Sequence, residues 1–247
     1  MSRKANLNKS QLESTSQEDE RIIQAYQRRG ERVLYIGSFF GYESLAHLIR
    51  MQERHRETLR LLAAHGFHPL ENMRILDVGC GDGNMLRQLL QWGASPQLLA
   101  GIELRSEPVE KALHLNPNLD IRCGSATKLP WPDAALDLAC QHTVFTSILD
   151  SLMRQQIAAE MTRIIRPGGA ILWYDFIYDN PHNPDVRGVK AKEIKKLFPE
   201  FKQYLHRITL APFVARRLPE SLLSVLYPLL SAIPLLRTHY LGLLIKP

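Results

Sequence analysis

Three glycines at alternate positions follow a short apolar run in the first half of the chain. Gly79, Gly81 and Gly83 come directly after the run 75–78. A residue without a β-carbon lets the backbone turn tightly and approach a bound ligand. Glu103 follows the next apolar run about 20 residues downstream, where an acid can accept hydrogen bonds from ribose hydroxyls. This combination predicts a nucleotide-like ligand at the end of a strand.

The spacing of the glycines narrows the kind of ligand. Dinucleotide sites use G-x-G-x-x-G to place a pyrophosphate on a helix N-terminus, whereas this pattern is G-x-G-x-G. Asp77 precedes the glycines, and its negative charge would repel a phosphate. An acid at this position favours a ligand that carries an ammonium group.

The segment Leu76-Asp77-Val78-Gly79-Cys80-Gly81-Asp82-Gly83 resembles the first motif of the class I S-adenosylmethionine-dependent methyltransferases. The order of strand-like and helix-like segments from residue 73 to 247 is similar to the core of that family, and residues before it resemble its variable helical caps. The resemblance implies S-adenosylmethionine as the cofactor.

Carried over by position, the resemblance assigns a set of cofactor-binding residues. Glycine backbone would lie under the methionine moiety, Asp77 near its ammonium group, and Glu103 at the ribose. Ser125 stands where the family often has an acid facing adenine, and Leu104 would pack on the adenine face. The full expected set is Asp77, Gly79, Cys80, Gly81, Glu103, Leu104, Ser125, Ala126 and Gln141.

Candidate catalytic groups follow the fourth and fifth strand-like runs. A hydroxyl acceptor profits from a base that titrates near neutrality, and His142 is the best-placed histidine for this role. His182 is the second choice and His239 the third. We also expect Asp175 to line the acceptor site with His182, because ligands of open α/β sheets bind beyond the carboxyl ends of strands.

Three further residues are expected to bind the acceptor. Tyr35 lies in an aromatic stretch between two predicted helices, and Tyr178 and Arg187 lie in the polar, aromatic segment after residue 175. No metal site is expected. A hard cation needs several oxygen ligands, and Gln141 and His142 do not supply the second carboxylate that would accompany Asp175.

Other methyltransferase subclasses fit less well. The four residues 141–144 differ entirely from the Asp/Asn-Pro-Pro-aromatic tetrad of enzymes that methylate nucleobase amines. Cys140 ends a buried strand-like run and does not match the nucleophilic cysteine of pyrimidine C5 methylation. We interpret it as a core residue.

Short apolar runs alternate with helical patterns from residue 73 onward, which predicts a mostly parallel sheet covered on both faces. Five strands are expected at 74–78, 98–102, 119–123, 136–140 and 170–174, with two more at 203–211 and 238–245. Helices are expected at 16–30, 43–65, 84–91, 108–115 and 151–165. The expected fold is a seven-stranded Rossmann-like α/β domain.

The domain boundaries follow from these patterns. We expect a flexible tail over 1–20, an N-terminal helical cap over 21–72, and the methyltransferase domain over 73–247. Lid insertions are expected at about 176–200 and, as apolar helices before the last strand, 212–237.

Positive charge is concentrated in the C-terminal third. Residues 176–247 carry 11 basic and 5 acidic side chains, whereas residues 74–175 carry 9 and 11. Residues 221–236 carry no charge, and this stretch is shorter than the roughly 20 residues that span a bilayer. It is interpreted as a lid, a homodimer interface or a segment that associates weakly with a membrane surface. Nucleic acid is not favoured as a partner because no binding module accompanies the basic residues.

The overall composition is that of an ordinary globular protein, with 45% hydrophobic and 23% charged residues among 247. Three cysteines without Cys-x-x-Cys spacing indicate neither a disulfide framework nor a zinc site, and the polar N-terminus has no secretory pattern. A cytoplasmic location is the resulting expectation. The predicted function is O-methylation of a small molecule, such as a secondary metabolite or a glycan or lipid precursor; the alternatives are RNA or protein methylation and a non-catalytic cofactor-binding partner subunit.

Overall fold

A single seven-stranded sheet organises the computed structural model, which describes residues 9–36 and 44–247. The strand order is β3-β2-β1-β4-β5-β7-β6. The strands are β1 (Ile75–Val78), β2 (Leu99–Glu103), β3 (Asp120–Cys123), β4 (Leu136–His142), β5 (Ile165–Phe176), β6 (Lys202–Leu210) and β7 (Arg237–Ile245).

The expected fold is confirmed. Strands β1 to β5 pair in parallel, and β7 is antiparallel to both β5 and β6. Every residue of β1 and β2 is buried, as short, largely apolar runs predict for strands covered on both faces. The carboxyl ends of β1, β2 and β4 therefore lie side by side at one edge of the sheet.

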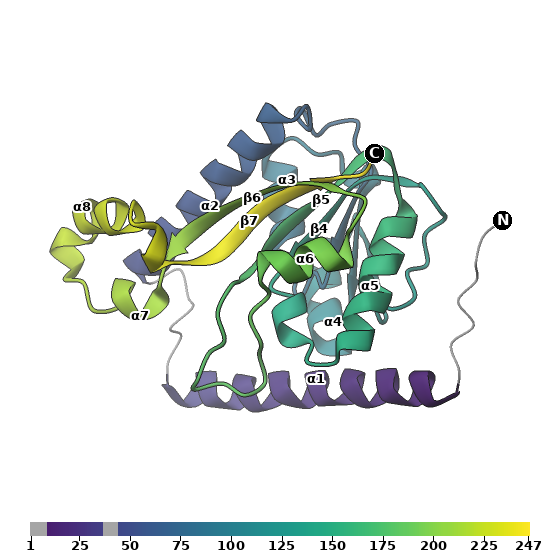
Figure 1. Cartoon of the computed structure of the whole chain (residues 1–247), viewed down its shortest axis with the longest axis horizontal. Coiled ribbons are helices and arrows are strands. Elements are labelled where there is room, and N and C mark those ends of the chain that lie inside the picture. The colour runs from purple at the N-terminus through teal and green to yellow at the C-terminus, as the bar shows by residue number, and fades with distance from the viewer. Residues whose placement is uncertain (1–8, 37–43) are drawn as a thin grey trace.

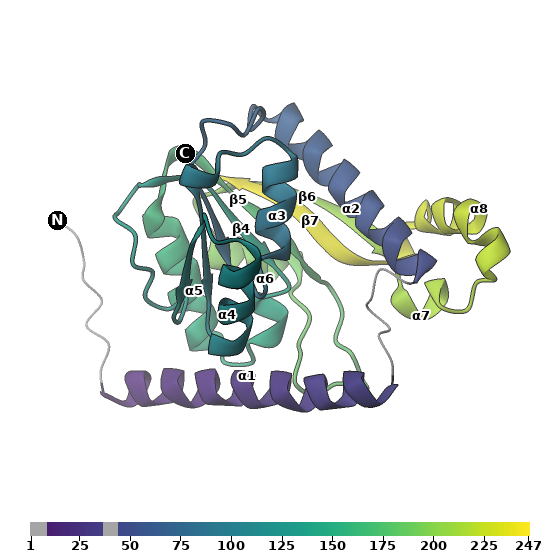
Figure 2. The same cartoon turned by 180° about the vertical axis from the view of Figure 1, so that it is seen from behind.

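Helices cover both faces of the sheet (Figures 1 and 2). Helices α2 (Leu45–Ala64), α3 (Asn84–Gln91) and α4 (Ser106–Leu115) contribute to the core on one face. Helices α5 (Ser151–Ile164) and α6 (Ala191–Leu197) contribute to the core on the other. Helices α2 to α5 lie close to the ranges that the hydrophobic periodicity predicts, whereas α6 falls in the segment expected to be a lid insertion.

The first helix departs from the sequence-based expectation. Helix α1 spans Lys9–Ile36, so it begins inside the segment expected to be a tail and continues beyond Gly30. In both views it runs along the edge of the sheet where β1, β2 and β4 end (Figures 1 and 2). The sequence pattern of α1 predicts its length poorly, because packing against distant parts of the chain stabilises the helix more than its own helix propensity does.

The insertion before the last strand forms a separate group of helices at one end of the molecule (Figure 1). It contains α7 (Pro212–Ala215), α8 (Glu220–Ser231) and a short 3-10 helix, Pro234–Leu236. Within residues 9–36 and 44–247, no helix combines the length and the hydropathy that a bilayer crossing requires.

Trp173 on β5 provides a test of the core. It is completely buried, and its ring lies 4.7 Å from that of Phe145, which follows β4. We expect Trp173→Ala to lower the free energy of unfolding by about 3–5 kcal/mol, because it leaves a large cavity. Leu235→Ala, at a side chain that is 80% exposed, should change it by less than about 0.5 kcal/mol. Equal losses in urea unfolding would contradict this placement of the core.

Candidate active site

The glycine turn at the end of β1 adopts the backbone conformation that its sequence predicts. Gly79, Gly81 and Gly83 all have positive φ, at +71°, +54° and +79°. A β-carbon on Gly79 would lie only 2.5 Å from Cγ2 of Val144. The amide nitrogens of Gly79 and Cys80 donate to the carbonyl oxygen of Ile102, at 2.8 and 3.0 Å, which fixes the turn against β2.

Asp77 places an unpaired carboxylate oxygen beside this turn. Its side chain is almost completely buried, and Oδ1 has no hydrogen-bond partner among the described residues. Nδ1 of His142 lies 3.9 Å from that oxygen, too far for a hydrogen bond, and is also unpartnered. Burial raises the pKa of Asp77, although His142 opposes this. A buried carboxylate oxygen without a donor is costly, and a cationic ligand beside it would offset that cost.

Glu103 ends β2 and faces the same pocket. Its Oε2 accepts from the Gly81 amide at 3.1 Å, and its Oε1 accepts from Nε of Arg105 at 2.8 Å. The Arg105 guanidinium in turn lies 4.0 Å from the centre of the Tyr26 ring on α1. Glu103 is therefore held at the pocket by the glycine turn on one side and by Arg105 on the other.

The loop after β3 meets α1 at the pocket. Ser125 Oγ donates to Oδ1 of Asp19 at 3.3 Å and lies 3.0 Å from Oγ1 of Thr127. Burial raises the pKa of Asp19, although the Ser125 hydrogen bond opposes it. Ser125 stands where the family often has an acid. Here a carboxylate comes instead from Asp19 of α1, more than a hundred residues earlier in the chain.

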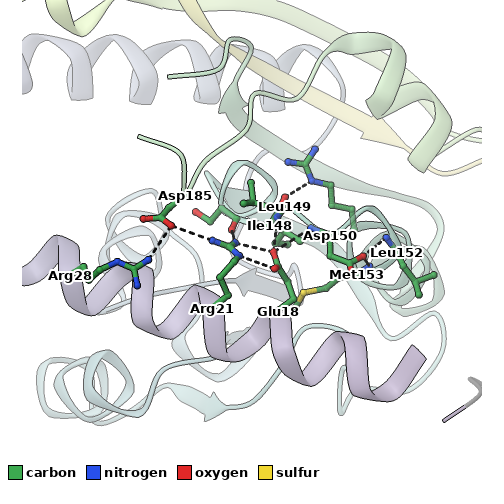
Figure 3. Close-up of polar contacts among 11 residues, drawn as sticks. Glu18, Arg21, Arg28, Ile148, Leu149, Asp150, Leu152, Met153 and Asp185 are labelled. Carbon is green, nitrogen blue, oxygen red and sulfur yellow. Dashed lines mark hydrogen bonds and ion pairs between the residues drawn. The ribbon is translucent and has the colours of Figure 1, made fainter. Parts of the chain in front are cut away.

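Helix α1 is fastened over the pocket by a buried acid (Figure 3). Oε1 of Glu18 accepts from the backbone amides of Leu149, at 2.6 Å, and Asp150, at 3.3 Å. Arg21 donates to Glu18 through Nε, at 2.8 Å, and through Nη2 to the carbonyl oxygen of Ser147, at 2.6 Å. Burial raises the pKa of Glu18, but the bonds from Arg21 and the two amides outweigh it, so the net pKa is lowered.

Most of the expected cofactor residues gather at this pocket. Gly79, Glu103, Leu104, Ser125 and Ala126 line it, as does His142. The other four lie behind or beside the lining. Asp77, Cys80 and Gln141 are buried, with Gln141 Oε1 accepting from the amide of Val144 at 3.2 Å, and Gly81 contributes its amide to Glu103.

Asp175 is not among the residues that line the pocket. It is completely buried at the end of β5, where Oδ2 accepts from the Thr146 amide at 3.1 Å and Oδ1 accepts from the Thr146 hydroxyl and the Phe176 amide. Burial raises its pKa to about 7, although the amide hydrogen bonds oppose this. In this arrangement Asp175 holds the loop after β4 rather than facing an acceptor.

The other expected acceptor residues also lie away from the pocket lining. His182 is exposed in a turn, where its amide donates to Asn180 at 3.0 Å, and Tyr178 is exposed as well. Arg187 donates to Glu193 at 2.8 Å, and its amide donates to the carbonyl of Thr146 at 2.9 Å. His239 is buried and stacks on Tyr174. Tyr35 lies within α1, and its side chain is outside the described residues.

Several residues that line the pocket were not predicted from the sequence. They are Asp19, Ile22 and Tyr26 of α1, Arg105 after β2, and a group from the segment after β4 into α5: Val144, Ser147, Ile148, Met153 and Ile157. Thr143 has a positive φ of 58°, which turns the chain sharply at the end of β4. Ile22 and Tyr26 do show helical spacing, but spacing alone does not say which surface a helix covers.

Amide hydrogen exchange in α1 tests whether the hydrogen bonds of Glu18 hold this helix against the rest of the protein. We expect Glu18→Gln to increase the rate of amide hydrogen exchange in α1 by about tenfold, because it removes a charged acceptor of four hydrogen bonds. Since its pKa is lowered in the folded state, this stabilisation is complete above the ordinary pKa and is lost as the pH falls through the lowered value. Glu20→Gln, at an exposed position of the same helix, is the control. Equal exchange in both variants would refute the fastening.

Comparison with known proteins agrees with this geometry. Residues 76–173 match the family model described as a methyltransferase domain. A sterol 4-C-methyltransferase from Caenorhabditis elegans is 29% identical over 140 residues, covering 52% of this chain and 40% of that protein. A probable S-adenosylmethionine-dependent methyltransferase from Mycolicibacterium smegmatis is 27% identical over 157 residues, covering 58% and 55%. The chain thus spans about half the length of these curated relatives, or less.

The solved structures agree on the fold. A SAM-dependent methyltransferase from Methanosarcina mazei superposes with a TM-score of 0.55 at 18% identity, covering 74% of this chain and 96% of that one. The glycine turn, the matched domain and the sheet order point to the same conclusion. Residues 76–173 therefore match a methyltransferase domain, and the sheet has the fold of S-adenosylmethionine-dependent methyltransferases, whose cofactor is S-adenosylmethionine.

Proposed function

We propose that the chain methylates a hydroxyl oxygen of a small molecule, with His142 as the base. The observation that carries this proposal is the unpartnered Nδ1 of His142 at the wall of the pocket, next to Asp77. S-adenosylmethionine supplies an electrophilic methyl group when bound. The chain's own contribution is to align the acceptor with that group and to remove the acceptor's proton.

The residues around the pocket fit the cofactor. The unpaired oxygen of Asp77 suits an ammonium group, and Gly79 leaves the space that a side chain would fill. Glu103 offers carboxylate oxygens for ribose hydroxyls. Asp19, next to Ser125, offers an acceptor for the adenine amino group.

His142 has the properties of a base at neutral pH. Burial lowers its pKa, and the positive charge of Arg54 lowers it further, while Asp77 opposes the shift. The imidazole is therefore neutral near pH 7 and can accept a proton. As the proton arrives, the Asp77 carboxylate 3.9 Å away stabilises the imidazolium.

A small apolar acceptor is consistent with the rest of the pocket wall. Ile148, Met153 and Ile157 line it, and the curated relatives include a sterol methyltransferase. We propose that the loop carrying Tyr178, His182 and Arg187 borders the acceptor entrance. Asp175 would position this loop indirectly. It accepts a hydrogen bond from the Thr146 amide, and the Thr146 carbonyl oxygen accepts one from the Arg187 amide.

The substitution Asp77→Asn should change the affinity for the cofactor without destabilising the fold. We expect the melting temperature of the free protein to stay the same or rise, because a buried unpaired charge is removed. The affinity for S-adenosylmethionine should fall at least about tenfold. In the wild type that affinity should also decrease as the pH is lowered through the raised pKa of Asp77, because the cation prefers the ionised carboxylate. Thermal shift with and without cofactor measures this, with Asp133→Asn at the surface as control; unchanged affinity in Asp77→Asn would refute the role.

Turnover tests the reaction itself. With methyl-labelled S-adenosylmethionine and a low-molecular-mass metabolite extract, we expect label in small molecules and a loss of about 10²–10⁴ in rate for His142→Ala. Because the pKa of His142 is lowered, the wild-type rate should persist below pH 6.5 and fall only at lower pH. His206→Ala, on the edge strand β6, is the control.

Other outcomes decide against the proposal. A loss of less than about threefold in His142→Ala, with cofactor binding unchanged, would remove His142 as the base. Label in RNA or protein but not in small molecules would contradict the substrate class. Cofactor binding without any labelled product would favour a non-catalytic partner subunit.

A further inference from the structure

The insertion between β6 and β7 presents an unusual amount of apolar surface. Among the described residues, ten large apolar side chains are exposed, and six of them lie between residues 213 and 235. They are Phe213 (55%), Leu222 (50%), Val225 (58%), Leu229 (62%), Ile233 (45%) and Leu235 (80%). Scattered exposed side chains are ordinary, but a concentrated patch marks an interaction site.

Three members of this patch form a stripe along α8. Leu222, Val225 and Leu229 are spaced three and four residues apart, which places them on one face of the helix. The opposite face carries Leu223 and Tyr227, which are buried. Helix α8 is therefore apolar on both sides, and only one side is covered by the rest of the protein.

A buried acid fixes the rotation of α8. Glu53 of α2 accepts a hydrogen bond from the Tyr227 hydroxyl at 2.8 Å through Oε2, and from the Ser231 hydroxyl at 2.6 Å through Oε1. All three residues are buried. Turning the stripe inward would break both bonds and leave a buried carboxylate without donors, which is costly. The outward direction of the stripe is thus built into the fold.

Charge next to the stripe indicates what covers it. Arg216 and Arg217 are exposed immediately before α8, and Glu220 is the single acidic residue from 212 to 236. Two copies meeting through this face would bring net positive charges together, because a two-fold contact joins identical patches. An anionic surface would instead be attracted by the arginines while the stripe enters an apolar layer.

We propose that residues 212–236 dock the protein onto the surface of an anionic lipid bilayer, with α8 lying in the interface. A helix of 12 residues is about 18 Å long, too short to cross and suited to lie along the boundary. The insertion joins the sheet at the edge where β5 and β6 end, the same edge that carries the cofactor pocket. Docking therefore brings that edge toward the bilayer. This proposal stands independently of the methyl acceptor and of His142.

Co-sedimentation of the full chain with vesicles tests the proposal. We expect binding to phosphatidylserine-rich vesicles at low ionic strength, much weaker binding to pure phosphatidylcholine, and weakening by salt. Arg216→Gln with Arg217→Gln should reduce partitioning by about fivefold per arginine. Leu222→Ser with Val225→Ser and Leu229→Ser should abolish it.

Matched controls separate the patch from general charge and hydrophobicity. Lys192→Gln with Lys196→Gln removes two exposed charges from α6, and Leu113→Ser with Leu115→Ser removes two exposed leucines from α4; both should bind as the wild type does. Circular dichroism checks that each variant is folded.

Two results would overturn the proposal. One is that the wild type fails to sediment with anionic vesicles at low salt, or that the stripe variant still sediments. The other is that light scattering finds a dimer which the stripe substitutions dissociate, while the wild type does not bind vesicles; the patch would then be an interface between copies.

Discussion

The buried carboxylate of Asp77 is the constraint around which the pocket is arranged. Its Oδ1 has no donor among the described residues, and burial makes its charge expensive. The glycine turn places backbone rather than side chain next to it, and His142 stands close without pairing to it. The fold therefore keeps an unpartnered carboxylate oxygen where the carboxyl ends of β1 and β4 meet. A cationic ligand bound there would offset the cost of burying this charge.

Helix α1 completes this site from outside the sheet. Glu18 and Arg21 fasten it to the segment before α5 (Figure 3). Tyr26 packs against the Arg105 guanidinium, which also donates to Glu103. Glu103 and Ser125, on two sides of the pocket, are thus linked through one helix.

The places of most strands along the chain follow from the sequence, because short, largely apolar runs between turn formers are typical of buried parallel strands. The glycine turn and Glu103 follow for the same reason, since local spacing determines both. The contribution of Asp19 and Tyr26 could not be predicted, because it depends on how α1 packs against Arg105 and Ser125, which are far from it in the sequence. The surroundings of Asp175 could not be predicted for a related reason: its position at the end of a strand does not show that Thr146 and Phe176 donate to its oxygens.

The central claim is that the pocket beneath α1 holds S-adenosylmethionine. Isothermal titration calorimetry of the wild-type chain with S-adenosylmethionine tests it most directly. The account predicts saturable binding at one site per chain, with heat that disappears when the demethylated product is already bound. Absence of binding heat even at millimolar cofactor, for a chain shown to be folded, would contradict it.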